Sequence, residues 1–382
     1  MGPLQGVKVI ELAGIGPGPF CAMLLADMGA DVIRIDRADR VQDPIPDGPY
    51  VEVMNRGRRS VGVDLKSPEG VETVLTLAES ADLLLEGFRP GVVERLGIGP
   101  DDCLARNPKL VFGRMTGWGQ DGPWAQMAGH DINYIALAGA LDHFGRKGEA
   151  PVPPLNLVGD FGGGAMFLAM GLLAGLVEAR NSGKGQVVDA AMVDGTAVLM
   201  TMFHSFASMG MWSEERGTNL LDTGTPYYDV YETADGRYMS VGALESQFFA
   251  VLVEKTGLTG PDGGPPTQND KSAWPHMREQ LTSIFKAKTR DEWTEVFEGS
   301  DACVAPVLTM SEARAQHHNV ERGTFIEVAD VPQPAPAPRF SRTENEIQRP
   351  PSWPGQHTDE VLSDWGVPSD QITAWRQAGA IR

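Results

Sequence analysis

Short apolar runs bounded by polar or glycine-rich stretches predict the strands of a parallel sheet. Val7–Leu12 alternates in the manner of a strand, Phe20–Met28 follows as a short helix, and Ala30–Arg37 forms the next strand. Strand, helix and strand in this order form a βαβ unit, whose two strands run parallel. Further strands are predicted at Asp82–Phe88, Leu110–Met115 and Gly185–Ala190. We therefore expect an α/β fold for this part of the chain.

Longer apolar runs in the middle of the chain predict helices. One run extends from Ile132 to Leu141 and another begins at Ala165. The stretch Phe161–Val177 carries no charge and approaches the length of a membrane span, but its glycines, alanines and methionines favour a buried helix. We therefore expect no membrane partner.

The composition changes near Met211, where a polar stretch predicts a linker at residues 211–224. Beyond it, Tyr227–Thr233 and Arg237–Val241 flank an Ala-Asp-Gly turn, which is a hairpin signal. Helical patterns follow, and the first of them is headed by Glu245. The chain is therefore predicted to contain a large α/β domain at residues 1–210 and a smaller α+β domain at residues 225–330.

Charge and cysteine usage narrow the class of partner. A net charge of −19 over 382 residues argues against nucleic acid and anionic membrane surfaces, which require a basic face. The three cysteines are far apart and show neither zinc spacing nor a disulfide pattern, and no secretion signal precedes the first strand. These features predict a cytoplasmic protein with reduced thiols and no bound metal.

Two polar residues stand directly before apolar helical runs. His130 precedes Ile132–Leu141, and Asp160 precedes a run of three glycines and the second helix. At helix N-termini, unpaired backbone N–H groups favour a neutral histidine and an ionised aspartate. Such a pair suits proton transfer at a carbon between them, with the backbone N–H of Asp131 as a donor to the oxygen that becomes charged. The alternative is that Asp160 is only a helix cap and His130 a hydrogen-bonded core residue.

Arginines gather at the ends of predicted strands, where α/β sheets bind ligands. Arg37 ends one strand, Arg89 and Arg95 follow another, and Arg56, Arg58 and Arg59 form a basic stretch between them. In an acidic protein this arrangement predicts a phosphate-bearing ligand. The alternative is that these arginines pair with surface carboxylates.

A partial glycine motif, Gly14-x-Gly16 with Asp36 further on, raises the possibility of dinucleotide binding. Pro19 stands where the third glycine of that motif is expected. The motif is therefore incomplete, and dinucleotide binding is the weakest of the functional hypotheses.

In their order along the chain, these segments resemble the class III CoA-transferase superfamily, and within it the α-methylacyl-CoA racemase branch. The matching stretches are VKVIELAGIGPGPF, ADVIRIDR, NRGRRSVGVDLK, EGFRPGVVERLG, RMTGWGQDGPWA, AGHDINYIALAG, PLNLVGDFGGGAMFL, GKGQVVDAAMVDG, PYYDVYETADGRYMSVGALE and DACVAPVL. The resemblance implies an interlocked homodimer in which a Rossmann-like large domain is completed by residues 331–382. Its active site lies between the large domain of one subunit and the small domain of the other.

The resemblance also implies roles for individual residues. His130 and Asp160 become an acid/base pair, and Glu245 of the other subunit supports His130. The substrate is a 2-methylacyl-CoA thioester, so CoA enters as part of the substrate and no separate cofactor is expected. The residues implied in binding it are Arg37, Gly62, Val63, Asp64, Leu65, Gly87, Phe88, Arg89, Arg95, Gly129, Ile132, Asn133 and Tyr134.

Two enzymatic hypotheses remain open alongside dinucleotide binding. An epimerase of 2-methylacyl-CoA needs both His130 and Asp160, whereas a CoA-transferase needs only a carboxylate nucleophile such as Asp160. The histidine favours the epimerase. The acyl group is not specified by the sequence. Several methionines either form an adaptable apolar surface for it or belong to the core, namely Met192, Met200, Met202, Met209 and Met211.

Overall fold

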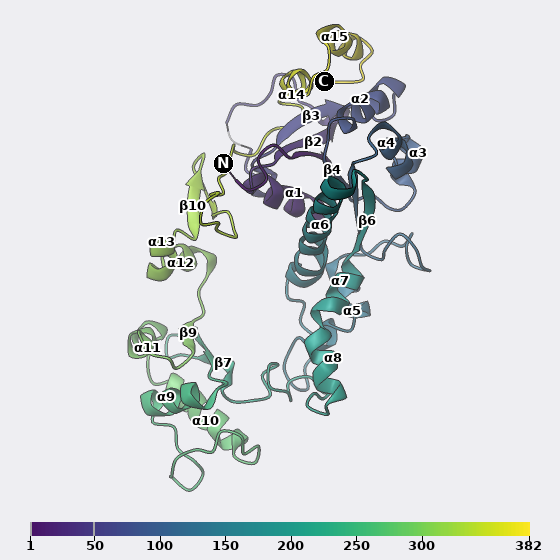
Figure 1. Cartoon of the computed structure of the whole chain (residues 1–382). Helices are drawn as coiled ribbons and strands as arrows, with labels where there is room; N and C mark the ends of the chain where they lie inside the picture. Colours follow the sequence, from purple (N-terminus) through teal and green to yellow (C-terminus); the bar gives the residue numbers. More distant parts are fainter. Residues whose placement is uncertain (1, 49) are drawn as a thin grey trace. The chain divides into compact units, whose positions relative to one another are not determined.

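The computed structural model describes residues 2–48 and 50–382 (Figure 1). Contacts divide the chain into two compact units, which are described separately. The first contains the residues up to Ala138, then Pro154–Met200 and Gly323–Arg382; the second contains Gly139–Pro153 and Thr201–Arg322. The stretch predicted to be a linker, residues 211–224, lies within the second unit.

The first unit is built on a six-stranded parallel sheet in the order β3-β2-β1-β4-β5-β6. The strands are β1 Lys8–Leu12, β2 Asp31–Arg37, β3 Arg59–Val63, β4 Leu83–Glu86, β5 Val111–Thr116 and β6 Gln186–Ala191. The predicted α/β class with a parallel sheet is confirmed. The order of the strands reverses between β1 and β4, which is where sheets of this kind bind ligands.

Alternation along each strand divides the core between the two faces of the sheet. In β1, Ile10 and Leu12 face one cluster, whereas Val9 faces the other. The first cluster is covered by α2 Pro68–Ala78, α4 Pro100–Arg106, α14 Thr358–Asp364 and α15 Ser369–Gln377. The second is covered by α1 Pro17–Asp27 and α6 Met166–Ser182. Figure 1 shows α14 and α15 beside β3 and α2, so distant segments of the chain share one core.

Strand β3 was not predicted from the sequence, because its arginines suggested a ligand-binding stretch. All five of its residues are buried. Its outer edge is covered by the last residues of the chain: Val63 pairs antiparallel with Ile381, and the N–H of Arg382 donates to the carbonyl of Gly62 at 3.0 Å. The N–H of Asp64 likewise donates to the carbonyl of Ala380 at 2.8 Å. The edge strand therefore has partners on both sides.

Helix α6 continues from a π-helical segment, η4 Leu157–Ala165. One side of α6 packs on β5 and β6, with Leu168 and Leu172 in the core. The other side exposes large apolar side chains, including Met170 at 60% and Val177 at 62%. By length and composition alone, Leu157–Ser182 would be able to cross a membrane. The prediction of a buried helix is therefore correct for one side of it only.

The second unit contains an antiparallel three-stranded sheet, β7 Tyr228–Glu232, β8 Tyr238–Gly242 and β9 Val304–Pro306. Its helices are α8 Thr201–Ser208, α9 Ser246–Thr256, α10 Trp274–Phe285, α11 Arg290–Phe297, α12 Met310–Ala315 and α13 His317–Arg322. Aromatic rings such as Tyr231, Phe285 and Trp293 fill the core between sheet and helices. The predicted hairpin around Ala234–Gly236 is confirmed.

The remaining elements belong mainly to the first unit. Its short helices are α3 Val92–Leu96, α5 Asp131–Leu137 and α7 Met192–Leu199, with single turns at η1 Ala38–Arg40 and η2 Val53–Asn55. A hairpin, β10 Phe325–Val328 and β11 Val331–Pro334, begins the return of the chain to this unit. The turn η3 Leu141–His143 belongs to the second unit.

Candidate active site

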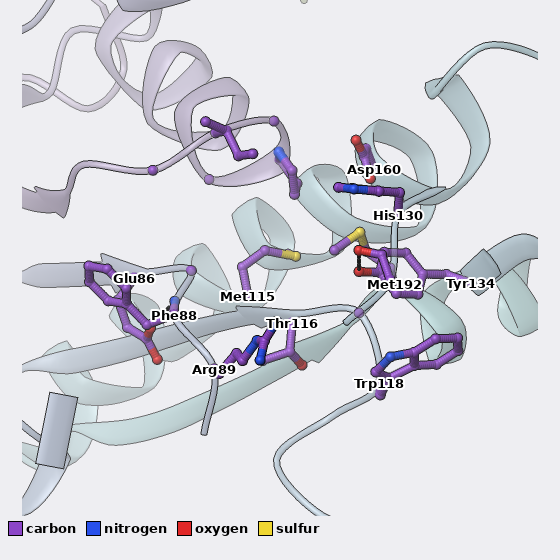
Figure 2. Close-up of a pocket in the computed structure, with 18 of the residues that line it drawn as sticks. Glu86, Phe88, Arg89, Met115, Thr116, Trp118, His130, Tyr134, Asp160 and Met192 are labelled. Atoms are coloured by element: carbon purple, nitrogen blue, oxygen red, sulfur yellow. Dashed lines mark hydrogen bonds between the residues drawn. The ribbon is translucent and has the colours of Figure 1, made fainter. Parts of the chain in front are cut away.

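A pocket of about 690 Å³ lies at the carboxyl ends of β1, β4 and β5. Its walls are the loops that follow these strands, Gly14–Pro19, Gly87–Pro90 and Gly117–Trp118, together with residues from α5 and η4. Figure 2 shows His130 and Asp160 together in one part of the pocket and Glu86 and Phe88 in another. The pocket therefore occupies the point at which the strand order reverses, in agreement with the general rule for such sheets.

His130 is the residue that precedes α5, and its side chain is exposed to the pocket. The backbone N–H of His130 donates to the side-chain oxygen of Asn133 at 3.0 Å, so Asn133 ties down the start of the helix. Tyr134, one turn further on, donates its hydroxyl to the carbonyl of Gly129. The prediction that His130 stands at a helix N-terminus is confirmed, and the alternative of a core histidine is excluded.

Two glycines make room for the ring that supports this helix start. A Cβ at Gly117 would lie 2.0 Å from Tyr134 Cε1, and one at Gly129 would lie 2.7 Å from the same atom. The ring of Tyr134 also meets Trp118 edge to face, with centroids 4.7 Å apart. Tyr134 therefore fixes the loop after β5 and the segment before α5 in one position.

Asp160 lies in the first turn of η4, at the start of the long helix that ends with α6. Its carboxylate accepts a hydrogen bond from the Asn156 side-chain amide at 3.1 Å. On the side of α1, a Cβ at Gly16 would lie 3.3 Å from Asp160 Oδ2, and Gly16 has a left-handed φ of 69°. The partial glycine motif therefore leaves space for Asp160.

The pKa of Asp160 is shifted in the opposite direction to the one that its helix position alone predicts. Burial raises the pKa of this carboxyl above its usual value, and the negative charge of Asp131 raises it further. The Asn156 hydrogen bond and the nearby His130 lower it, but they are outweighed. The helix position favours the ionised form of Asp160, whereas desolvation and a like charge shift the pKa of its carboxyl upward.

Asp131 joins the two helix starts directly. It is 5% exposed, and its Oδ2 accepts the backbone N–H of Asp160 at 2.7 Å. From the sequence, only the backbone N–H of Asp131 was predicted to have a role, as a donor to the oxygen that becomes charged. The link between its side chain and Asp160 spans 29 residues and has no signal in the sequence.

The structure brings only part of the predicted CoA-binding set to this pocket. Gly87, Phe88 and Arg89 line it, as do Gly129 and Tyr134. Arg37, Gly62, Val63, Asp64, Leu65, Arg95, Ile132 and Asn133 are not among the lining residues. Arg89 and Arg95 are exposed, and Arg37 is exposed with Asp39 as its ion-pair partner at 2.5 Å. The N–H of Gly62 donates to the Thr358 hydroxyl at 3.0 Å, so this backbone group is already bonded.

The basic stretch at Arg56, Arg58 and Arg59 does not form a ligand site. Arg56 pairs with Asp27 at 2.6 Å, and Arg58 pairs with Glu11 at 2.6 Å with both side chains fully buried. Arg59 reaches Asp31 at 2.8 Å and Asp364 at 2.6 Å. The prediction of phosphate binding here is wrong, because these guanidinium groups are used in pairs with carboxylates far along the chain.

Sequence reasoning missed Glu86, which lines the pocket and is fully buried. Its carboxylate accepts the N–H of Phe88 at 2.6 Å and the Arg114 Nε–H at 3.0 Å. Burial raises the pKa of Glu86 from 4.5 to about 7. The only available signal was a charged residue at the end of an apolar strand, directly before the glycine of the following loop.

The family model described as CoA-transferase family III matches residues 4–358 of this chain. The chain belongs to CoA-transferase family III. The resemblance inferred from the sequence is thereby confirmed, and the pocket lies in the unit that carries most of the matched residues.

Relatives of this chain are named for different reactions. The chain is 45% identical over 372 residues to an alpha-methylacyl-CoA racemase of Mus musculus, which covers 97% of this chain and 95% of that protein. It is 29% identical over 385 residues to succinyl-CoA:glutarate CoA-transferase of Homo sapiens, covering 95% of this chain and 86% of the relative. A crystal structure of a CAIB/BAIF family protein from Brucella suis matches with a TM-score of 0.83 over 95% of this chain and 99% of the other. At 24% identity that structure supports the fold alone.

Two remaining predictions concern Glu245 and the methionines. Glu245 directly precedes α9 in the second unit and is exposed, so its support of His130 stays a prediction. Among the methionines, Met192 lines the pocket, whereas Met202, Met209 and Met211 are exposed on the second unit. These three methionines are therefore not core residues of that unit.

Proposed function

We propose that this protein is an α-methylacyl-CoA racemase that interconverts (2R)- and (2S)-2-methylacyl-CoA thioesters. One observation carries the proposal: a histidine and an aspartate from two helix starts, His130 and Asp160, share one pocket and interact electrostatically. A racemase needs two proton-transferring groups on opposite faces of one carbon. The full-length similarity to proteins named alpha-methylacyl-CoA racemase supports the same activity.

The chemistry follows from the weakness of the acid. The C2 proton of a thioester is far less acidic than a side-chain acid, so its removal requires both a base and stabilisation of the enolate oxygen. His130 or Asp160 removes the proton from one face, and the conjugate acid of the other returns one to the opposite face. The backbone N–H of Asp131, in the first turn of α5, is the proposed donor for the enolate oxygen.

The CoA portion enters as part of the substrate, and the proposed reaction uses no further cofactor. Gly87, Phe88 and Arg89 are the best-placed residues for its pantetheine or phosphate groups, because they line the same pocket as His130. The N–H of Phe88 is held by Glu86 at 2.6 Å, so the loop has a fixed shape. Arg37, Arg95 and Gly62–Leu65 are proposed to contact more distant parts of CoA.

A class III CoA-transferase is the second candidate, favoured by the similarity to succinyl-CoA:glutarate CoA-transferase. In that reaction Asp160 attacks the thioester, CoA leaves, and the mixed anhydride is converted to an enzyme thioester before transfer to a second carboxylate. This mechanism requires Asp160 and no histidine. The position of His130 in the same pocket favours the racemase.

Incubation in D2O separates the two reactions. A racemase interconverts the two epimers without any acceptor and places deuterium at C2, because both side chains exchange their protons with solvent. A transferase leaves the C2 proton in place, requires a free carboxylate acceptor and shows ping-pong kinetics. Acceptor-dependent turnover with an inert C2 proton would overturn the proposal.

We further propose that the protein is a homodimer in which Glu245 of one subunit supports His130 of the other. The exposed apolar side of α6 and the neighbouring edge strand β6 support a protein partner, since Met166, Met170, Val177 and Val187 are all more than two-fifths exposed. Such a continuous apolar surface marks an interface. A second copy is the partner that would supply Glu245.

Subunit mixing tests this arrangement. Glu245→Ala and Asp160→Ala proteins are unfolded and refolded together, and mixed dimers are isolated by two different affinity tags. One site of each mixed dimer then contains both an intact Asp160 and an intact Glu245, so part of the activity should return. Mixed dimers as inactive as the two parents would contradict a site shared between subunits.

A further inference from the structure

The carboxylate of Asp131 connects the two helix starts that carry the proposed acid/base pair. Asp131 lies in the first turn of α5, directly after His130, and is 5% exposed. Its Oδ2 accepts the backbone N–H of Asp160 at 2.7 Å. The first turn of η4 is thus attached to the first turn of α5 by a side chain that does not line the pocket.

The other oxygen of this carboxylate is left without a partner. Within residues 2–48 and 50–382, Asp131 Oδ1 is buried and has no hydrogen-bond partner. A purely structural link to one N–H group would be made as well by a neutral oxygen, at a smaller desolvation cost. The site therefore keeps a charge that its hydrogen bond does not need.

Neighbouring residues fit closely around this carboxylate. A Cβ at Gly159 would lie 2.6 Å from Asp131 Oδ2 and 3.0 Å from Ile135 Cγ2. The residue before Asp160 therefore has to be a glycine for the two helix starts to approach. The contact therefore joins the backbone of η4 to the Asp131 side chain, and a side chain at residue 159 would crowd it.

We propose that Asp131 is a positioning residue that fixes Asp160 against His130 and sets its protonation state. The inference rests on the proposed acid/base role of Asp160 and adds a residue that acts through it. The link fixes the backbone from which the Asp160 carboxylate projects, and the charge acts on that carboxylate from outside the pocket.

The groups around Asp160 act on it in opposite directions. The Asn156 amide donates to it at 3.1 Å and stabilises the ionised form, as does His130. Asp131 opposes them and raises the pKa of Asp160. From the side of α1, Gly16 faces the carboxylate without bringing a charge.

Three other titratable groups line the same pocket. They are Tyr134, Arg89 and Glu86. Burial raises the pKa of Tyr134, and the charges of Asp160 and Asp131 raise it further, whereas Arg89 lowers it. Glu86 belongs to the separate pair with Arg114. Among the groups of the described chain that are named here as acting on Asp160, Asp131 is the charged one that favours its protonated form.

This effect matters because a racemase uses Asp160 in both protonation states. In one direction the ionised carboxylate removes the C2 proton, and in the other the neutral acid returns it. An acid works best when its pKa is close to the working pH. A like charge beside Asp160 brings its pKa closer to that range.

Asp131→Asn tests the charge alone. Its amide oxygen still accepts the Asp160 N–H, while the negative charge is lost. Asp160 then loses its proton more readily, so the acid limb of the kcat/KM profile should move to lower pH. The shift should be equal in both directions of epimerisation, because the limb belongs to the coupled pair His130 and Asp160.

Asp131→Ala tests the hydrogen bond as well. With the link removed, kcat should fall about tenfold further than in Asp131→Asn, which is the value of one such bond. KM for the acyl-CoA should stay within about twofold, since Asp131 does not line the pocket. Asn156→Ala is the matched control with the opposite sign: it removes a bond to the ionised carboxylate, so the acid limb should move to higher pH.

The outcomes separate this inference from the proposed function. If Asp160→Ala retains full epimerase activity, the acid/base role fails regardless of Asp131. If Asp160→Ala is inactive while Asp131→Asn is folded and keeps the wild-type acid limb, only the present inference fails. Should Asp131→Asn not fold, Asp131→Ser supplies a neutral acceptor oxygen and is subject to the same criterion.

Discussion

The first unit holds its charged side chains in two opposite ways. Around β1 and α1, opposite charges are buried as pairs: Arg58 with Glu11 and Arg56 with Asp27, each at 2.6 Å. At the starts of α5 and η4, two like charges, Asp131 and Asp160, are brought together at the wall of the pocket. Pairing opposite charges offsets the cost of burying each of them, so that removal of one partner leaves an unpaired buried charge. Placing like charges together raises the free energy of the ionised pair and makes one of them easier to protonate, which is useful for proton transfer.

The largest expected effect is the loss of activity when either acid/base residue is removed. Asp160→Ala and His130→Ala should each reduce epimerisation by about 10²–10⁴-fold, because a general acid or base is lost. Thermal unfolding should be little changed, since both side chains face the pocket. The measurement is the rate of interconversion of (2R)- and (2S)-2-methylacyl-CoA. His317→Ala, at an exposed histidine of the second unit, is the matched control and should be fully active. Near-normal activity in the Asp160→Ala variant would show that the like-charge pair Asp131 and Asp160 is not needed for proton transfer.

The buried opposite-charge pair should show the reverse pattern, with loss of stability. Arg58→Ala leaves Glu11 as an unpaired buried charge and should lower the free energy of unfolding by about 3–5 kcal/mol in denaturant titrations. Arg106→Ala is the control at a half-exposed pair with Glu72 and Glu79, where about 0–1 kcal/mol is expected. The double variant Glu11→Leu/Arg58→Met should recover most of the loss, because no unpaired charge remains. A loss below about 1 kcal/mol for Arg58→Ala would show that the pair is dispensable.

Glu86 combines features of the two regions. It is buried in an ion pair with Arg114, and it also lines the pocket. Its pKa rises from 4.5 to about 7 on folding, so the folded state binds this proton more tightly than the unfolded state. The contribution of Glu86 to the free energy of unfolding should therefore decrease as pH rises from about 4.5 to about 7, by roughly 2–3 kcal/mol.

Glu86→Gln cannot bind that proton. Its stability relative to the wild-type protein should therefore increase across the same pH interval, as measured by denaturant titrations at several pH values. A difference between the two proteins that is constant from pH 4.5 to pH 7 would mean that Glu86 is ionised throughout.

The smallest expected effect concerns Arg89. This arginine is exposed and forms no ion pair with a carboxylate in the described part of the chain. Arg89→Ala should raise KM for the acyl-CoA about tenfold and make it less sensitive to salt, because one charge-assisted contact to CoA is lost. The thermal midpoint should not change. Arg37→Ala is the comparison at an arginine already paired with Asp39. If neither variant weakens CoA binding, the nucleotide lies elsewhere.

The sequence contained enough information for most of the sheet but not for its edge. Five strands follow short apolar runs, which are a local property of the chain, namely β1, β2, β4, β5 and β6. β3 escaped prediction because Arg59 starts a buried strand, and its partner carboxylates include Asp364, 305 residues away. Hydrogen bonds of such range leave no local trace.

The same limit applies to the site. His130 and Asp160 could be recognised because each precedes a helical run, and capping is a local signal. The raised pKa of Asp160, in contrast, comes from burial and from Asp131, which only the tertiary structure brings together. Gly16 belongs to the incomplete glycine motif that raised the possibility of dinucleotide binding, whereas in the structure it leaves room for a carboxylate.

The closure of β3 by residues 380–382 has a consequence for the nascent protein. The first unit takes its last pieces from Gly323–Arg382, so α14, α15 and the residues that cover β3 leave the ribosome after the whole of Thr201–Arg322. Until they arrive, β3 is an uncovered strand edge beside an incomplete core, and edges of this kind recruit strands from other chains. The second unit thus completes its sequence first, and the β3 edge of the sheet that carries the pocket stays uncovered until residues 380–382 have been made.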